Sequence, residues 1–431
     1  MSTLAVMKAD SRAGRRAIER LVRRGENILD AKTLRKASRI VDRVRRRGDR
    51  ALLDFAREHD GAVAKSVADL ALGEPADSAA LSAGFVEALE RAIAAVERFH
   101  APQVRTGYRL EDEDGAMLEE RIHPLRRVGI YVPGGRAAYP STVVMTVIPA
   151  KLAGVQEIAV ATPPGSYRAN PAIRHALERL GVTEVWGMGG AHAVAAFAYG
   201  TETIPRVDKI VGPGNAWVTA AKKLVAGDVA IDGIAGPSEV VILADSDADP
   251  SLLAADLLAQ AEHDPQAAAV LITCDAKQGK LVAREVDLQL AELSTRDTAR
   301  ESLLRFGAAL VVSSLDEAVA LVERIAPEHL QLVGQESEVV AGRINSAGAV
   351  FLGACTPEVF GDYIAGPSHV LPTCGSARFA SALGVEDFLR RSHTIRFTPA
   401  AAARRAAAAA ALADAEGLPA HAASARRRLL G

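Results

Sequence analysis

Cysteines and long apolar runs are scarce in this 431-residue chain, and each shortage excludes a class of protein. Its three cysteines, Cys274, Cys355 and Cys374, lie far apart in the sequence, which excludes a disulfide framework or a thiolate zinc cluster and favours a reducing compartment. No uninterrupted apolar run reaches about 18 residues, so we expect no transmembrane helix. A formal net charge of −2 gives no reason to expect binding to nucleic acid or to an anionic membrane. We therefore expect a cytoplasmic protein without nucleic-acid or membrane partners.

The glycine fingerprint Gly-x-Gly-x-x-Gly, which usually cradles the phosphates of a dinucleotide, opens none of the expected strand–helix units. Other glycine- and proline-rich turns are present instead. Pro133-Gly134-Gly135 follows one expected strand, and Gly212-Pro213-Gly214-Asn215 follows another. The sequence Ala-Gly-Pro-Ser occurs twice, at 235–238 and 365–368, but four residues are too few to indicate a duplicated domain.

The spacing of apolar residues predicts helices first, and then alternating strands and helices. Four early stretches have the period of about 3.6 that is typical of helices with charged outer faces. They are Ala9 to Arg24, Lys32 to Arg47, Ala51 to Glu58 and Ala79 to His100. From Arg127 onward, short solid runs rich in Val and Ile indicate strands that are buried on both faces of a parallel sheet. These runs are Val128–Val132, Ile158–Ala161, Val185–Met188, Lys209–Val211, Val240–Ala244, Val270–Cys274, Leu310–Val312 and Ala349–Leu352.

This alternation predicts an α/β protein with two Rossmann-like, doubly wound parallel-sheet domains, a helical N-terminal segment and a helical C-terminal tail. The predicted division is an N-terminal segment at 1–27, a discontinuous α/β domain at 28–128 plus 240–383, a second α/β domain at 129–239, and a tail at 384–431. In the tail, the run Ala406–Ala411 favours a helix, which Gly417 and Pro419 end just after Glu416.

Gln260 and His263 form the first candidate metal pair. Asp249-Pro250 is a typical helix start, and Asp264-Pro265 lies just past the expected end of the helix. The pair would then lie in the last turn, with both side chains on one face. Zinc binds histidine nitrogen and neutral or anionic oxygen. On this pair alone, however, a histidine that interacts with the helix dipole is the preferred interpretation.

Glu328 and His329 are the candidate catalytic pair. A histidine base beside a carboxylate that activates water would suit a reaction in two stages. Adjacent side chains point in different directions, so the two would line one cavity rather than act on one proton. The local sequence, with Pro327 ahead of Glu328, is also typical of a solvated helix N-terminus, and that interpretation leads on local grounds.

Asp362 and His369 lie in a loop with Gly366 and Pro367, while Glu416 and His421 flank a helix-breaking Gly-Leu-Pro in the tail. Polar groups on a rigid loop are often functional, but aspartate beside glycine is also ordinary turn chemistry. The residues alone therefore predict a multi-domain α/β protein with a candidate His/Gln/Asp metal site, and they do not specify a reaction.

Taken in order, these motifs resemble the histidinol dehydrogenase family. The matching segments follow the family's order and cover nearly everything from about residue 30 to the tail, which makes the resemblance specific. They are 129–135, 189–191, 207–215, 235–239, 260–263, 326–330, 361–363, 369–372 and 415–417 with His421.

The resemblance implies roles for individual residues. The implied zinc ligands are Gln260, His263, Asp362 and His421, and the implied catalytic residues are Glu328 and His329. The implied substrate contacts are Ser238, Gln260, His263, His329, Asp362, His369, Glu416 and His421. Tyr131 and Asn215 match contacts to NAD, which would assign the cofactor to the 129–239 domain. His192 stands where the family has a glutamine. Because imidazole lacks an amide's paired donor and acceptor, that contact is not carried over.

The implied activity is a zinc- and NAD-dependent alcohol and aldehyde dehydrogenase. It would oxidise L-histidinol by four electrons through L-histidinal to L-histidine, the last steps of histidine biosynthesis, with one zinc per subunit. The family also implies a homodimer with shared active sites, in which each tail reaches the partner subunit.

Other readings of the sequence remain open. A related dehydrogenase would act on another small amino alcohol or a sulfonated diol, although a carboxylate at Glu416 suits an ammonium group better than a sulfonate. A zinc hydrolase would use Glu328 or His329 to activate water without NAD. A noncatalytic binding protein would have no use for the Glu328–His329 pair.

Overall fold

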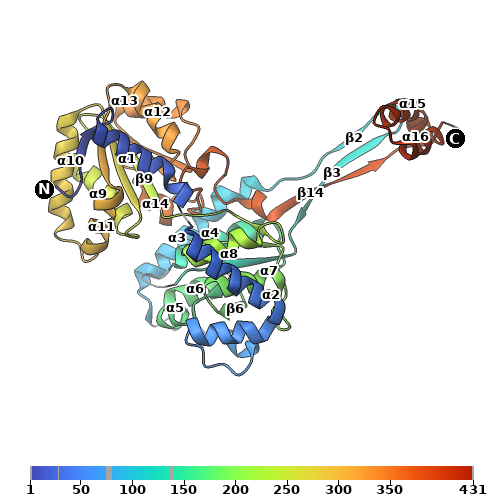
Figure 1. Cartoon of the computed structure of the whole chain (residues 1–431), viewed down its shortest axis with the longest axis horizontal. Helices are drawn as coiled ribbons and strands as arrows, with labels where there is room; N and C mark the ends of the chain where they lie inside the picture. Colours follow the sequence, from blue (N-terminus) through green and yellow to red (C-terminus); the bar gives the residue numbers. More distant parts are fainter. Residues whose placement is uncertain (1, 28, 74–79, 135–138, 430–431) are drawn as a thin grey trace.

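Two parallel sheets form the body of the protein, and a smaller antiparallel sheet forms an arm (Figure 1). The structure is a computed structural model that describes residues 2–27, 29–73, 80–134 and 139–429. Gly135 of the predicted turn, Ala79 at the predicted start of one helix, and the domain limits at residues 1, 28 and 431 lie outside these ranges.

The first sheet has six parallel strands in the order β1-β11-β10-β9-β12-β13. They are β1 (Val6–Lys8), β9 (Glu239–Ala244), β10 (Ala268–Thr273), β11 (Ala308–Val311), β12 (His329–Val333) and β13 (Ala349–Leu352). Residues of α1 (Arg12–Val22) and α12 (Leu315–Ile325) pack on one face of this sheet. Residues of α9 (Pro250–Ala261), α10 (Ala276–Leu290) and α11 (Arg296–Phe306) pack on the other. Helices on both faces explain why its central strands are solid apolar runs.

The second sheet has five parallel strands in the order β6-β5-β4-β7-β8. They are β4 (Arg127–Tyr131), β5 (Glu157–Thr162), β6 (Glu184–Gly187), β7 (Lys209–Val211) and β8 (Ala230–Ile231). One core contains residues of α2 (Ala31–His59), α7 (Gly190–Tyr199) and α8 (Ala216–Val225). The opposite core contains residues of α3 (Ala83–His100), α4 (Pro140–Leu152) and α6 (Pro171–Arg179). The short α5 (Pro164–Ala169) packs beside α6. The predicted fold class is confirmed.

The arm was not predicted. Strand β3 (Met117–Pro124) pairs antiparallel with β2 (Arg109–Glu111) on one side and with β14 (Leu389–Arg396) on the other. The arm extends from the body and carries α15 (Pro399–Ala415) and α16 (Pro419–Arg426) at its tip (Figure 1). Arg405 of α15 pairs with Asp112 and Asp114, which fixes α15 to the turn between β2 and β3. As predicted, the helix stops before Gly417: α15 ends at Ala415, Glu416 is its C-cap, and Gly417 adopts a left-handed φ of 71°.

The division into domains stays a prediction, and two sets of contacts bear on its boundaries. Strand β1, from the predicted N-terminal segment, pairs with β11 at the edge of the six-stranded sheet. Helix α2, which the prediction groups with that same sheet, packs instead against α7 and α8 of the five-stranded sheet. Among the described residues, no helix is long and apolar enough to cross a membrane.

Candidate active site

Glu328 and His329 lie at the amino end of a buried strand, and the expectation of a helix start here is wrong. Helix α12 ends at Ile325, its C-cap Ala326 turns the chain out of the helix with a φ of 50°, and β12 begins at His329. The apolar residues after His329 fill a strand that pairs with β9 and β13, so a helix here would leave β13 unpaired and one edge of β9 without a partner. Each side chain of the pair is only 7% exposed, so neither has the solvated position of a helix cap.

The backbone of Glu239, the first residue of β9, holds both members of the pair. Its N–H donates to Glu328 Oε2 at 3.0 Å, and its carbonyl oxygen lies 3.2 Å from His329 Nδ1. A carbonyl only accepts, so Nδ1 carries the proton and Nε2 keeps a free lone pair. Burial lowers the pKa of His329 despite the opposing charge of Asp362, which favours this neutral form.

Carboxylates surround the imidazole of His329. Glu328 Oε2 and Glu358 Oε2 each lie 3.7 Å from His329 Nδ1, and Asp362 Oδ1 lies 3.9 Å from Nε2. Burial raises the pKa of Glu328 well above its usual range, and the charges of Glu239 and Asp362 raise it further. Burial is also the main reason why the pKa of Glu358 is well above its usual range. This concentration of buried acids would be stabilised by a cation.

Three of the four predicted zinc ligands lie around these acids. Gln260 is in the last turn of α9, as predicted, and is 1% exposed. His263 lies just past the helix end; burial is the main cause of the lowered pKa of both His329 and His369, and the proximity of His263 lowers both further. Asp362 lies on α14 (Glu358–Tyr363), which packs against α9. His369 joins them, with Nδ1 4.0 Å from Asp362 Oδ1 and a pKa lowered by burial.

The donor set fits a metal ion but is incomplete within one chain. Gln260 Oε1 is buried with no hydrogen-bond donor among the described residues, and its helix α9 packs against α14, which carries Asp362. A neutral amide oxygen, a carboxylate and an imidazole are all ligands that zinc accepts. In the part of the chain that the structure describes, however, no three His, Cys, Asp or Glu side chains are placed to hold a metal together.

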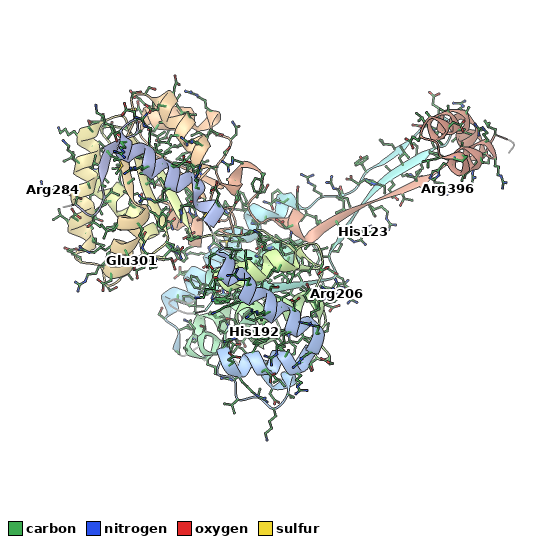
Figure 2. All side chains as sticks on the ribbon, in the orientation of Figure 1. His123, His192, Arg206, Arg284, Glu301 and Arg396 are labelled. Carbon is green, nitrogen blue, oxygen red and sulfur yellow. The ribbon has the colours of Figure 1, made fainter. Side chains whose placement is uncertain are left out.

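Glu416 and His421 lie elsewhere. Glu416 is the C-cap of α15, His421 lies on α16, and both are exposed at the tip of the arm. The structure therefore does not bring them to Gln260 within the same chain (Figure 1). Figure 2 marks the path of the arm from His123 at its base to Arg396 near its tip.

The predicted cofactor residues lie at the carboxyl edge of the five-stranded sheet. Tyr131 ends β4, and its hydroxyl accepts a hydrogen bond from the N–H of Gly190 at 3.0 Å. Burial raises the pKa of Tyr131 to about 12. Asn215 follows β7 and caps α8, because its Oδ1 accepts from the N–H groups of Trp217 and Val218.

Two further features of this edge bear on cofactor binding. Gly212 has a φ of 107°, and a Cβ there would lie 2.2 Å from the carbonyl oxygen of Tyr131, so only glycine fits. His192 is a buried residue of α7 (Figure 2), and its Nε2 lies 2.7 Å from Asp60 Oδ2. The same carboxylate oxygen accepts the N–H of Gly189.

Ser238, a predicted substrate contact, directly precedes β9, and its carbonyl oxygen accepts the N–H of Ala268. The sequence reasoning missed three residues that the structure adds to the site: Arg24, Glu239 and Glu358. Glu239 closes a motif that the resemblance includes, so its position carried a signal. Glu358 follows Pro357 and looks like an ordinary first-turn acid, and only its burial distinguishes it.

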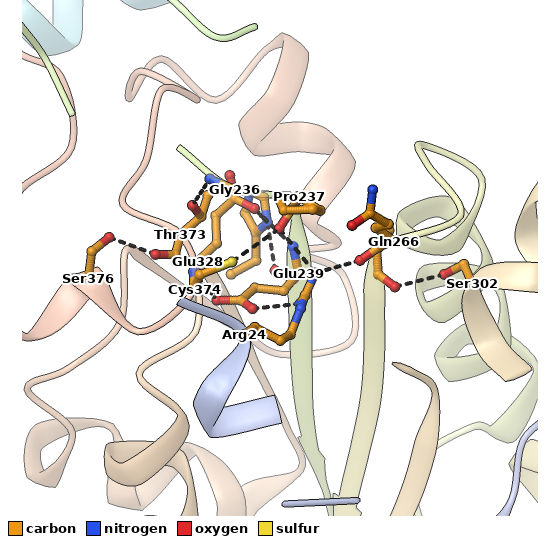
Figure 3. Close-up of polar contacts among 12 residues, drawn as sticks. Arg24, Gly236, Pro237, Glu239, Gln266, Ser302, Glu328, Thr373, Cys374 and Ser376 are labelled. Atoms are coloured by element: carbon orange, nitrogen blue, oxygen red, sulfur yellow. Dashed lines mark hydrogen bonds and ion pairs between the residues drawn. The ribbon is translucent and has the colours of Figure 1, made fainter. Parts of the chain in front are cut away.

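Arg24 and Glu239 form a buried ion pair in which Nη1 lies 2.7 Å from Oε2 (Figure 3). The Glu239 carboxylate also accepts the N–H of Cys374 at 2.8 Å. Burial raises the pKa of Glu239, and the charge of Arg24 opposes that rise. Because the N–H of Glu239 donates to Glu328, this ion pair lies next to the catalytic candidate.

Comparison with known proteins identifies the family. The sequence matches the family model described as Histidinol dehydrogenase over residues 23–429. A curated histidinol dehydrogenase of Synechococcus sp. is 48% identical over 404 residues, which is 93% of this chain and 93% of that protein. Another, from Geobacter sulfurreducens, is 48% identical over 90% of this chain and 92% of that protein.

Solved structures agree. The crystal structure of histidinol dehydrogenase from Elizabethkingia anophelis, at 33% identity, gives a TM-score of 0.90 and covers 100% of this chain and 98% of that chain. A probable aldehyde dehydrogenase from Listeria monocytogenes shares the fold alone, with 14% identity, a TM-score of 0.51, and coverage of 89% of this chain and 96% of that chain. With the family model matched along nearly its whole length, the chain belongs to the histidinol dehydrogenase family.

Proposed function

We propose that this protein is an L-histidinol dehydrogenase that oxidises L-histidinol through L-histidinal to L-histidine, the last steps of histidine biosynthesis. The reaction removes four electrons, as two hydrides, and uses zinc and NAD. The observation that carries the proposal is the buried Glu328–His329 pair beside Asp362, in a chain of this family.

The zinc ligands in this proposal are Gln260, His263 and Asp362 from one chain and His421 from a second copy. Zinc, when bound, supplies a Lewis acid that orients the nitrogen atoms of the substrate. The unpartnered Oε1 of Gln260 and the surrounding buried acids support a cation at this place.

His329 and Glu328 would divide the proton transfers. The neutral ring of His329 offers Nε2 to the substrate hydroxyl and takes its proton as hydride leaves for NAD. Glu328 would then activate water to attack the aldehyde, and His329 would act again on the hydrate. The raised pKa of Glu328 makes its carboxylate a stronger base for water than an exposed carboxylate.

The remaining predicted contacts complete the proposed substrate and cofactor sites. Ser238 and His369 would contact the substrate within the chain, and Glu416 of a second copy would pair with its ammonium group. Tyr131 and Asn215 would contact NAD, which receives the hydride. The position of both residues at the carboxyl edge of a doubly wound sheet supports this assignment.

A homodimer with shared active sites follows from this ligand set. Glu416 and His421 extend away from their own body on the arm (Figure 1). The arm and tail also expose large apolar side chains: Leu110 at 56%, Ile395 at 65%, Phe397 at 43% and Leu412 at 69%. Such surface is what a dimer interface would bury.

The activity is tested by following NADH formation with L-histidinol, NAD and zinc. Two equivalents of NADH per histidinol are expected, and none when Glu328 and His329 are both replaced. A hydrolase would show turnover without NAD, and another substrate preference would show as faster oxidation of a different amino alcohol or of a sulfonated diol.

The shared site is tested by mixing His263→Ala and His421→Ala subunits. Each mixed dimer would carry one site with both defects and one site with neither, so about half of the normal activity per mixed dimer should return. If subunits exchange and no activity returns, the tail belongs to the site of its own chain.

A further inference from the structure

The backbone of a single residue, Glu239, anchors both proposed catalytic side chains. Its N–H donates to Glu328 Oε2 and its carbonyl accepts from His329 Nδ1. The parallel register, in which Val240 lies opposite His329, brings the amino ends of β9 and β12 together. A small shift of the backbone at Glu239 would therefore move or release both side chains at once.

The side chain of Glu239 connects this part of the backbone to the rest of the molecule. It is 4% exposed, and its two oxygens are divided between Arg24 and the N–H of Cys374. Cys374 has an unusual φ of 53° for a residue that is not glycine. The carboxylate thus binds the loop around Cys374 to the start of β9 (Figure 3).

Arg24 reaches this place from η1 (Arg23–Asn27), a short helix next to α1. Its Nη2 donates to the carbonyl oxygens of Gln266 at 2.6 Å and Pro237 at 3.3 Å, while Nη1 pairs with Glu239. The guanidinium carbon also lies 5.0 Å from the centroid of the Phe306 ring. One buried cation therefore fixes the segments that lead into both β9 and β10.

We propose that Arg24 and Glu239 are positioning residues for the proposed reaction, and that they set the place of the Glu239 backbone and through it the orientation of Glu328 and His329. The inference rests on the proposed function. Neither side chain is a predicted contact of the substrate, the metal or the cofactor.

The chemistry of the Arg24–Glu239 pair explains why its loss would lower the rate of the reaction. Without Arg24, the Glu239 carboxylate would remain buried beside Glu328 with no cation. A lysine at position 24 would restore the charge but not the planar fork that contacts Glu239, Gln266 and Pro237 together. Displacement of a catalytic group by about 1 Å lowers rates by roughly a hundredfold.

The test compares Arg24→Met, Arg24→Lys and Glu239→Gln with Arg20→Met as the matched control. Arg20 is exposed, lies one helical turn away, and approaches the same Phe306 ring at 5.9 Å. All rates are expressed per folded, zinc-loaded site. We expect Arg24→Met to lower kcat about a hundredfold, with little change in the KM for histidinol or in zinc content. Arg24→Lys should lie between Arg24→Met and the control.

Charge matching gives a second readout. Combining Arg24→Met with Glu239→Gln removes the buried cation and the buried anion together, so kcat should recover partly above Arg24→Met alone. A role in folding alone would lower the melting temperature and the yield but leave kcat per folded site within about twofold of the control. That result, or a fall in zinc content that accounts for the lost activity, would overturn the proposal.

A measurement that needs no activity separates this inference from the proposed function. The ¹⁵N signals of His329 should report a proton on Nδ1 in the wild-type protein and in Arg20→Met, and a changed tautomer balance in Arg24→Met. Identical His329 signals in all three proteins would refute the positioning role, even if the wild-type protein did not oxidise histidinol.

Discussion

The two parallel sheets offer opposite edges to the proposed chemistry. In the five-stranded sheet, Tyr131 and Asn215 follow the carboxyl ends of β4 and β7, where the strand order reverses. This is the usual ligand position in open α/β sheets. In the six-stranded sheet, Glu239 and His329 stand at the amino ends of β9 and β12. A search confined to carboxyl edges would therefore have found the cofactor candidates and missed the catalytic pair.

Helix direction explains the difference. The helices that follow parallel strands begin near the carboxyl edge of the sheet and end near its amino edge. The positive end of a helix dipole favours anions such as the phosphates of a cofactor, and the expected NAD contacts Tyr131 and Asn215 lie beside the N-termini of α7 and α8. Helix C-termini favour cations, and α9 ends with Gln260 just ahead of His263. The anion-binding and cation-binding ends of the same architecture would thus be used for NAD and for zinc.

The largest expected effect is a loss of zinc at the amino edge of the six-stranded sheet that leaves NAD binding at the other sheet intact. His263→Ala should lose zinc and at least about a thousandfold in activity, while the fold and NAD binding persist, because a ligand is removed at the amino edge alone. Metal content, NADH formation and NAD binding are the measurements. His393→Ala is the control, since His393 is an exposed histidine on the arm. Stoichiometric zinc in His263→Ala would reject the ligand assignment.

The sequence predicted the parallel sheets well, because strands buried on both faces are solid apolar runs. The eight expected strands each overlap an observed one. It missed β12, since Pro327 and Glu328 look like a helix start until the pairing of β12 with β9 is known. It also missed β3 and β14 of the arm. Their residues are half-buried or exposed along the whole strand, so they lack the solid apolar run of a buried strand.

The next effect lies within the amino edge. Glu328→Gln should slow oxidation of added histidinal about a hundredfold or more, and should affect the first hydride transfer far less, because only the second stage requires activated water. Glutamine keeps the acceptor for the N–H of Glu239, so the geometry is retained. Single-turnover rates of the two stages provide the comparison. Equal loss in both stages would contradict the division of roles between Glu328 and His329.

Much of the candidate site was beyond local sequence reasoning, which preferred non-functional interpretations for His263 and Glu328. Only the resemblance to a family assigned these residues to one site. Physically, the approach of α9, which carries Gln260, to the helix of Asp362 depends on the packing of α14 against α9, which no local pattern encodes. The buried state of Glu358 is likewise a property of the packed site rather than of its neighbours in sequence.

A smaller effect belongs to the carboxyl edge. Asn215→Ala and Asn215→Ser should both raise the KM for NAD about tenfold, without loss of zinc, because each removes the amide proposed to contact the cofactor. Only the alanine variant should also lose about 1 kcal/mol of stability, since serine still caps α8. Thermal unfolding distinguishes the two. Unchanged KM values would remove Asn215 from the cofactor site.

The smallest effect concerns a histidine that serves neither edge. His100 ends α3, is 1% exposed, and has no hydrogen-bond partner for either ring nitrogen among the described residues. Burial lowers the pKa of His100 below the usual 6.5. As the pH falls, His100 therefore binds a proton in the unfolded chain before it does so in the folded protein. The stability associated with its neutral form is present above pH 6.5 and is lost as the pH falls through the folded pKa.

His100→Leu should therefore weaken the fall in melting temperature between neutral and mildly acidic pH, and should leave zinc content, NAD binding and kcat at neutral pH unchanged. The effect is limited to about 1.4 kcal/mol per unit of pKa shift. His393→Leu is the control, because an exposed histidine has no buried neutral form to lose. An acid sensitivity that is the same in all three proteins would mean that the carboxylates at the amino edge, rather than His100, govern the pH response.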